Sequence, residues 1–357
     1  MKVSIAMVTY NHEQYIAKAL DSVLMQKTNF DYEIVIGEDC STDGTRAIVI
    51  DYQHRYPDKF RLLLNETNLG MHKNADQTIN ACKGEYVAML DGDDHWTAPY
   101  KLQKQVDFLE SHPECSICFH DSIIVYEDGS KEPSHYRPSQ KEFSTVEDIL
   151  LDNFIPTASV MFRSGLIRRL PDWVNELKMG DWPMLILTAH HGKIGYIDEA
   201  MSVYLVHHAG VWSMKDEHFI FLAILEMYEA LDKHLGVKFT WITSRILRGR
   251  YFVESMRQEN IGDLTKAIYY TIKSINKDLL IIIEPIRLTN RDKSYFANAL
   301  PHVVYVSSAQ LIRRVLKLHV TLLRSLLSTY LVPILRIYFP PLYKFLRVIA
   351  RRQDLRL

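Results

Sequence analysis

The first ninety residues alternate between short apolar runs and segments with helical spacing. Val3 to Thr9 is apolar almost throughout, which indicates a strand buried on both faces. Ile16, Leu20, Val23 and Leu24 then recur at three- and four-residue intervals, the pattern of an amphipathic helix. Further strands are predicted over Tyr32 to Gly37, Phe60 to Leu64 and Glu85 to Leu90, and further helices after Ser41-Thr42-Asp43 and over Lys73 to Ala81. This order predicts a Rossmann-like α/β fold with a mostly parallel sheet and right-handed crossovers.

The pattern becomes less regular after the fourth strand. The elements that it predicts are a helix over Ala98 to Ser111, a strand over Cys115 to Tyr126, a strand over Ile155 to Phe162, a helix over Leu185 to Ala189 and a short strand over Val203 to Val206. From about Asp216 onward the spacing is helical throughout. We therefore expect an α/β domain over residues 1–215, a helical extension over 216–310 and a basic amphipathic helical tail over 311–357.

Composition places the chain among soluble globular proteins with a sizeable core, because 47% of its 357 residues are hydrophobic and 24% are charged. The net charge of −1 provides no overall field for nucleic acid, so we expect no such partner. The residues after Met1 do not form a signal peptide, and four cysteines with free thiols fit a reducing cytoplasm. Cys115 and Cys118 form a lone CxxC, which we interpret as part of a core strand rather than a zinc site.

Polar clusters follow three of the predicted strands. The first strand ends in Thr9-Tyr10-Asn11, the second in Glu38 to Asp43, and the fourth in Asp91 to Asp94. Ligands of parallel α/β sheets bind at the carboxyl ends of the strands. The three clusters are therefore expected to meet at one sheet edge and to form a ligand site.

The segment DGDD, Asp91 to Asp94, places three carboxylates within four positions, where they repel one another. Mg²⁺ or Mn²⁺ would relieve this repulsion, since such cations take carboxylate ligands together with substrate phosphates. The sequence has no GxGxxG after the first strand and no GxxxxGK[ST], so a glycine-rich loop is not available to hold phosphates. We favour a metal site, with a polar turn that caps the next helix as the alternative.

Five segments, taken in order, resemble the motifs of family 2 glycosyltransferases of the GT-A fold. They are VTYNHEQYI from Val8, GEDCSTDGT from Gly37, DGDD from Asp91, GDW from Gly180 and VYLVHHAGVWS from Val203. The resemblance spans Met1 to about Ser213 and does not extend into the helical region. It implies an inverting, metal-dependent enzyme that moves a sugar from a nucleotide sugar, with UDP favoured, to a hydroxyl of a glycan or lipid-linked glycan in cell-surface polysaccharide synthesis.

The resemblance also implies roles for individual residues. Those that would bind the donor are Thr9, Tyr10, Asn11, Asp39, Asn74 and Asp91. Those that would bind the metal are Asp93, Asp94 and His207. Asp181 would be the general base that takes a proton from the acceptor hydroxyl. It could also cap a helix that begins at Trp182-Pro183, and both roles are compatible.

Three positions depart from the family pattern, and two other functions remain to be separated. Glu38 stands in place of an aspartate, Leu205 in place of an arginine and Ala209 in place of a glycine. A sugar nucleotidyltransferase would need a glycine-rich, basic loop after the first strand, and TYNHEQY is neither. A peripheral membrane module that binds a nucleotide sugar without turnover is the second alternative.

The last 47 residues, from Leu311 onward, carry ten basic side chains and one acidic side chain, Asp354. Their apolar stretches stay shorter than the roughly 18 residues of a spanning helix and are interrupted by Pro333, Pro340 and Pro341. Basic residues on apolar helices are typical of an interfacial anchor on an anionic membrane surface. We favour such an anchor on the inner face of the cell membrane. Packing on the catalytic domain and a contact between two copies of the chain are the alternatives.

Overall fold

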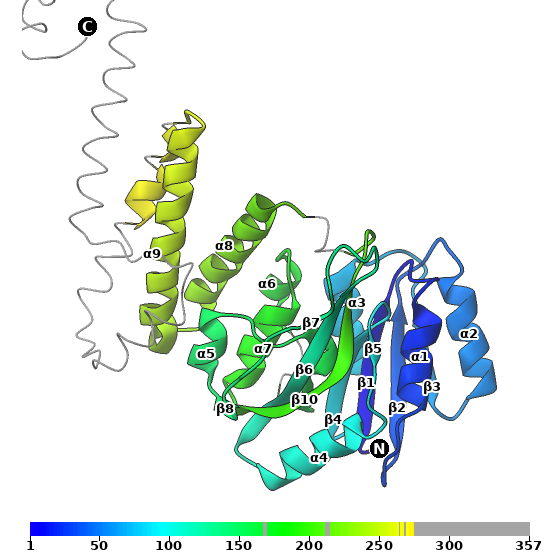
Figure 1. Ribbon diagram of the computed structural model, residues 1–357. Coiled ribbons are helices and arrows are strands. Elements are labelled where there is room, and N and C mark those ends of the chain that lie inside the picture. Colours follow the sequence, from blue (N-terminus) through cyan, green and yellow to red (C-terminus); the bar gives the residue numbers. More distant parts are fainter. Residues whose placement is uncertain (167–169, 211–214, 264, 268, 275–357) are drawn as a thin grey trace, which may run out of the picture. The chain divides into compact units, whose positions relative to one another are not determined.

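The computed structural model describes residues 1–166, 170–210, 215–263, 265–267 and 269–274 (Figure 1). The strands are β1 (Val3–Thr9), β2 (Tyr32–Glu38), β3 (Phe60–Leu64), β4 (Tyr86–Asp91), β5 (His95–Trp96), β6 (Cys115–Tyr126), β7 (Ser134–His135), β8 (Phe143–Ser144), β9 (Met161–Arg163) and β10 (Lys193–Val206). The helices are α1 (Ile16–Leu24), α2 (Thr45–Arg55), α3 (Met71–Ala81), α4 (Lys101–Ser111), α5 (Val146–Leu151), α6 (Asp172–Asn175), α7 (Asp181–Ala189), α8 (Glu217–His234) and α9 (Val237–Asn260), with a 3₁₀ helix, η1, at Thr157–Ser159.

The strands form one mixed sheet in the order β3-β2-β1-β4-β9-β6-β10-β5, with β7 paired to β6 and β8 to β10. The first four strands are parallel neighbours, and β6 and β10 also run parallel. The short strand β9 joins the two parallel groups and is antiparallel to both β4 and β6. The predicted α/β fold with a mostly parallel sheet is therefore confirmed.

Strand register brings the polar segments to one edge of the sheet. Val8 of β1 lies opposite Gly37 of β2 and Asp91 of β4, so the three strands end side by side. Along β4, Ala88 and Leu90 belong to the main hydrophobic core, because alternate side chains of a strand point to opposite faces. The intervening residues of β4 face the other side of the sheet, where the site is formed.

Two predicted strands differ from the observed ones, each for a local reason. β10 begins at Lys193, ten residues before the predicted start at Val203. Register shifts between Ile197 and Ser202 interrupt the alternation of polar and apolar residues, so the sequence pattern did not reveal the first part of this strand. The single strand predicted over Ile155 to Phe162 is divided between η1 and β9. The other predicted strands of the first half agree with the structure to within one residue.

The chain divides into two units, Met1–Ala230 and Leu231–Leu357. The described residues of the second unit are helical over most of their length. The predicted division at residues 215 and 310 stays a prediction. None of the helices that the structure describes combines the length and apolar character needed to cross a membrane. The rest of the extension and the whole basic tail lie outside the described residues.

Candidate active site

A cavity of about 740 Å³ opens where β1, β2 and β4 end, a volume typical of small-molecule sites. Nine of the ten residues expected from the sequence line it: Thr9, Tyr10, Asn11, Asp39, Asn74, Asp91, Asp93, Asp94 and Asp181. The tenth, His207, lies directly behind Asp93, with 3.1 Å between His207 Nε2 and Asp93 Oδ2. One cavity thus collects residues from distant parts of the sequence.

Asp39 organises a loop that borders the cavity. Its carboxylate accepts hydrogen bonds from the backbone N–H groups of Leu69 (2.8 Å) and Gly70 (2.9 Å) and from Asn65 Nδ2 (2.9 Å). Gly70 has φ of 84°, a conformation that favours glycine. The sequence NLG therefore forms a turn fixed by Asp39, whose bond to a nucleotide base stays a prediction.

Three other residues assigned to the donor differ in their surroundings. Asn11 and Asn74 have protein partners, because Asn11 Oδ1 accepts from the backbone N–H of Thr42 (2.8 Å) and Asn74 Nδ2 donates to Gly37 O (2.8 Å). Tyr10, by contrast, is 41% exposed at the cavity. Its ring is therefore available for stacking, while the two amides hold the loops in place.

Glu38, which departs from the family pattern, has a structural role here. Its side chain is fully buried and forms an ion pair with Arg46 of α2. It also accepts a hydrogen bond of 2.7 Å from the backbone N–H of Ser41. The substitution is accommodated because Arg46 neutralises the charge of the carboxylate and the Ser41 backbone N–H donates a hydrogen bond to it.

The DGDD segment is attached to the end of β10 through two of its aspartates. Asp94 Oδ1 accepts a hydrogen bond of 2.9 Å from the backbone N–H of Leu205, and Asp93 contacts His207. Leu205, the position where the family pattern has arginine, thus contributes through its backbone. The metal role of Asp94 stays a prediction.

His12 joins this cluster, although the sequence analysis gave it no role. Its Nε2 lies 3.7 Å from Asp93 Oδ2, and its Nδ1 lies 3.3 Å from Thr9 Oγ1. The one signal in the sequence was its position three residues after the end of β1, inside the motif VTYNHEQYI. Two imidazoles therefore approach the same carboxylate.

Burial and crowding separate the pKa values of the neighbouring carboxyl groups. Burial, with the charges of Asp93 and Asp181, raises the pKa of Asp91 to about 8. Burial also raises the pKa of Asp94, reinforced by the charges of Asp93 and Asp91. For Asp93, burial acts upward, but the hydrogen bond with His207 and the proximity of the His12 and His207 imidazoles lower its pKa overall. Asp93 is thus the carboxylate kept ionised, as a cation ligand must be.

The donor set suits a divalent cation that binds together with a substrate. Within the described residues, no group of three or more His, Cys, Asp or Glu side chains surrounds a common metal position. Asp93 and His207 nevertheless present an oxygen and a nitrogen 3.1 Å apart. Mg²⁺ and Mn²⁺ sites commonly use one or two protein carboxylates and complete the shell with phosphates and water. The residues present therefore fit such an ion.

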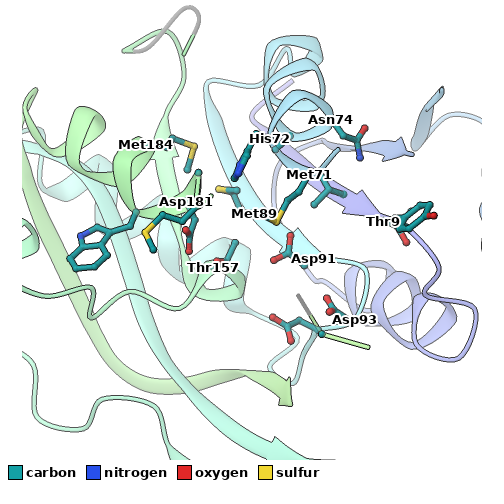
Figure 2. A pocket seen from close by; sticks show the side chains of 18 of the residues that line it. Thr9, Met71, His72, Asn74, Met89, Asp91, Asp93, Thr157, Asp181 and Met184 are labelled. Atoms are coloured by element: carbon teal, nitrogen blue, oxygen red, sulfur yellow. The ribbon is translucent and has the colours of Figure 1, made fainter. Parts of the chain in front are cut away.

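Asp181 lies at the first residue of α7, with Gly180 as the N-cap, so the helix starts one residue earlier than the capping alternative assumed. Burial raises the pKa of its carboxyl group, and the Thr157 side chain donates a hydrogen bond to it. A Cβ atom on Gly180 would lie 2.4 Å from His72 Nδ1, so α3 packs tightly on this segment. Figure 2 shows Asp181 on the α7 side of the cavity and Asp91 and Asp93 on the β4 side.

Comparison with known sequences identifies relatives of the first unit. The family model described as Glycosyl transferase family 2 matches residues 4–170. An uncharacterized protein of Mycobacterium tuberculosis is 40% identical over 214 residues, 59% of this chain and 60% of that protein. The chain thus spans about three fifths of that relative's length. TuaG of Bacillus subtilis, provisionally named a teichuronic acid biosynthesis glycosyltransferase, is 31% identical over 189 residues, 50% of this chain and 73% of TuaG.

Solved structures share the fold at low sequence identity. TarS 1-349 of S. aureus in complex with UDP-GlcNAc has a TM-score of 0.59 and 19% identity, over 91% of this chain and 92% of that chain. The mannosyltransferase PcManGT of Pyrobaculum calidifontis, in complex with GDP-Man and Mn²⁺, has a TM-score of 0.53 and 16% identity, over 89% and 87% of the two chains. These similarities establish a GT-A type fold.

Proposed function

The chain belongs to glycosyl transferase family 2, and on that premise we propose that it transfers a sugar from a UDP-linked donor to a hydroxyl acceptor with inversion at the anomeric carbon. One observation carries the proposal. Asp93, with its partner His207, and Asp181 lie at one cavity whose volume suits a nucleotide sugar. The first two can face the diphosphate and the third the acceptor.

The proposed reaction exchanges two bonds at the anomeric carbon. The acceptor oxygen forms a bond to that carbon while the bond to the diphosphate oxygen breaks, and Asp181 takes the proton of the acceptor hydroxyl. Its raised pKa makes the carboxylate a stronger base near neutral pH. The hydrogen bond from Thr157 orients it. Inversion needs one base, and Asp181 lies outside the strand-end carboxylate cluster.

The departing diphosphate needs a positive partner. None of the described residues that line the cavity is lysine or arginine. A divalent cation would supply the missing charge and stabilise the leaving group. Asp93 and His207 are the residues that would hold it, and Asp91 would lie near the ribose and donor sugar. Because the pKa of Asp93 is lowered, its carboxylate does not need the cation in order to be ionised.

Turnover of UDP-sugars is the direct test. The protein is incubated with a panel of UDP-sugars and Mn²⁺, and release of UDP is measured with and without EDTA. We expect slow hydrolysis that depends on the metal, because water can replace the acceptor. UDP binding without release would favour the nucleotide-sugar-binding module. Formation of a UDP-sugar from UTP and a sugar phosphate would favour the nucleotidyltransferase.

The acceptor that we propose is a glycan or lipid-linked glycan at the inner face of the cell membrane. TuaG supports this, since its name assigns it to teichuronic acid synthesis. The ten basic residues from Leu311 onward support it from the sequence alone. Co-sedimentation with anionic vesicles tests the proposal, and binding should weaken with salt as the Debye length falls from about 10 Å at 0.1 M to about 3 Å at 1 M. A chain that ignores anionic vesicles at low salt would contradict it.

A further inference from the structure

The cavity is lined by apolar side chains as well as by carboxylates. Four methionines, Met71, Met89, Met179 and Met184, line it together with Leu170 and Val174. Figure 2 shows Met71, Met89 and Met184 in the same cavity as Asp91 and Asp181. We call these four methionines the methionine wall. The proposed transfer of a sugar gives this wall no role.

On the β4 side, the wall adjoins the carboxylate that would contact the donor sugar. Met89 and Asp91 are two residues apart in β4, so their side chains point to the same face of the sheet. Leu90 between them is fully buried in the core on the opposite face. Along the strand the two positions are roughly 7 Å apart. The thioether and the carboxylate can therefore contact one sugar ring at once.

On the α7 side, the same arrangement recurs beside the proposed base. Asp181 and Met184 are three residues apart in α7, a spacing that places side chains on one helix face with roughly 5–6 Å between their Cβ atoms. Met184 and Met179 are 4% and 6% exposed. Both carboxylates that flank the reacting carbon thus have an apolar neighbour within the span of a single hexose.

The size and charge of this part of the cavity limit which sugars can bind there. Because the methionine wall adjoins the carboxylates of Asp91 and Asp181, we expect it to contact the donor sugar. Five aspartates line the cavity, and none of its described lining residues is lysine or arginine, so a carboxylate-bearing sugar is disfavoured. A hydroxymethyl group placed on methionines would lose its hydrogen bonds to water without replacement. A methyl group has no hydrogen bonds to lose there, and flexible methionines pack closely around it.

We infer that the donor sugar carries a methyl group that packs on the methionine wall, either the C6 methyl of a 6-deoxyhexose or the methyl of an N-acetyl group. The inference rests on the proposed function. The two sources share the same chemistry, an uncharged sugar with one apolar substituent near the anomeric centre. Adaptable methionines suit both, and the experiment separates them.

Binding of matched donors tests the inference. The full chain, with Mn²⁺, is titrated with UDP, UDP-glucose, UDP-6-deoxyglucose and UDP-N-acetylglucosamine. The three sugars share configuration and nucleotide. One of the two methyl-bearing donors should bind about 10-fold or more tightly than UDP-glucose, the discrimination that one methyl group gives in an apolar pocket. Equal binding of all three sugars would overturn the inference and leave the proposed function standing. Failure to bind UDP at all would instead refute the proposed function.

Variants locate the effect. Met89→Gln and Met71→Gln keep the side-chain length and add polarity, so the preference for the methyl-bearing donor should fall to within a few-fold while UDP affinity is unchanged. Met71 is 38% exposed and tolerates the change if Met89→Gln does not fold. Met256→Gln, at a 43% exposed position of α9, is the matched control and should keep the full preference. A preference retained in both cavity variants would contradict the inference.

Spectra of the protein with ¹³C-methyl methionine provide an independent readout. The methyl signals of Met71, Met89 and Met184 should shift when the preferred donor is added, and much less with UDP alone. Equal shifts with UDP alone would show that the wall does not meet the sugar. Shifts produced by an alkyl glycoside acceptor, and by no donor, would assign the wall to the acceptor and overturn the inference.

Discussion

Two clusters of buried ionisable groups in the first unit, one at Asp93 and one at Lys101, have different surroundings. Around Asp93, carboxylates and imidazoles contact one another and border the cavity. Lys101 of α4 and His120 of β6 are both fully buried, and neither lines that cavity. Lys101 Nζ lies 3.8 Å from the centroid of the Trp96 ring, and neither Lys101 Nζ nor His120 Nε2 has a hydrogen-bond partner in the described structure.

The difference shows that burial alone does not identify an active site. Desolvation shifts pKa values in both clusters, lowering that of Lys101 to about 7 and raising that of Asp91 to about 8. Only the cluster at Asp93 combines complementary partners with access for a ligand. The comparison predicts that changes at Asp93 or Asp181 abolish or strongly reduce activity with little loss of stability, whereas changes at Lys101 alter stability and spare activity.

The largest effect is expected from Asp93→Ala. Transfer should fall to background and metal-dependent UDP binding should be lost, because the ionised ligand is removed. The free energy of unfolding should change little, because the repulsion within the crowded carboxylate cluster is relieved while His207 loses its hydrogen-bond partner. Calorimetric titration with UDP and Mn²⁺, combined with thermal unfolding, measures both. Asp128→Ala, at a turn outside the cavity, is the control. Unchanged turnover in Asp93→Ala would rule out the metal assignment.

Asp181→Asn should lower kcat by roughly 10²–10⁴-fold with UDP affinity nearly unchanged, because an amide keeps the shape but cannot accept the proton. Single-turnover rates and UDP titration separate the two effects. Asp172→Asn is a matched control, since Asp172 also occupies the first residue of a helix, α6, but does not line the cavity. Lost UDP affinity with kcat retained would make Asp181 a binding residue.

Gly180→Ala should have a smaller effect, about 10-fold on kcat. The added Cβ would lie 2.4 Å from His72 Nδ1, so either the imidazole or the segment that carries Asp181 must move. A shift of the base by a fraction of an ångström weakens proton transfer without removing it. The double variant with His72→Ala opens the space and should regain part of the loss relative to His72→Ala alone. Purely additive effects would show that the contact does not position the base.

Sequence patterns predicted the parts of the site that depend on local order. The strand ends at Thr9, Glu38 and Asp91 follow from apolar periodicity, and their meeting at one edge follows from parallel pairing. His12 was missed because its partner, Asp93, is distant in the chain and no spacing rule connects them. The methionine wall was missed for the same reason: its members come from α3, β4, the segment before α7 and α7 itself, and each reads as ordinary core in its own segment.

The smallest effect on activity, and the clearest on stability, is expected from Lys101→Met. The folded-state pKa of Lys101 is about 7 and its ordinary value 10.5, so between these values the unfolded chain binds a proton that the folded chain does not. Stability of the present protein should therefore rise as pH increases from about 7 toward 10.5, and the variant should lack this contribution.

At pH 7 the variant should be more stable by about 1–4 kcal/mol, since methionine fills the space without a buried amine. Lys104→Met, on the same helix with a 45% exposed side chain, should change stability by less than about 0.5 kcal/mol. Denaturant unfolding at pH 7 and pH 9.5 measures the slope. If Lys101→Met instead destabilises the fold and lowers kcat as strongly as Asp181→Asn, the buried amine takes part in the activity and the contrast between the two clusters is wrong.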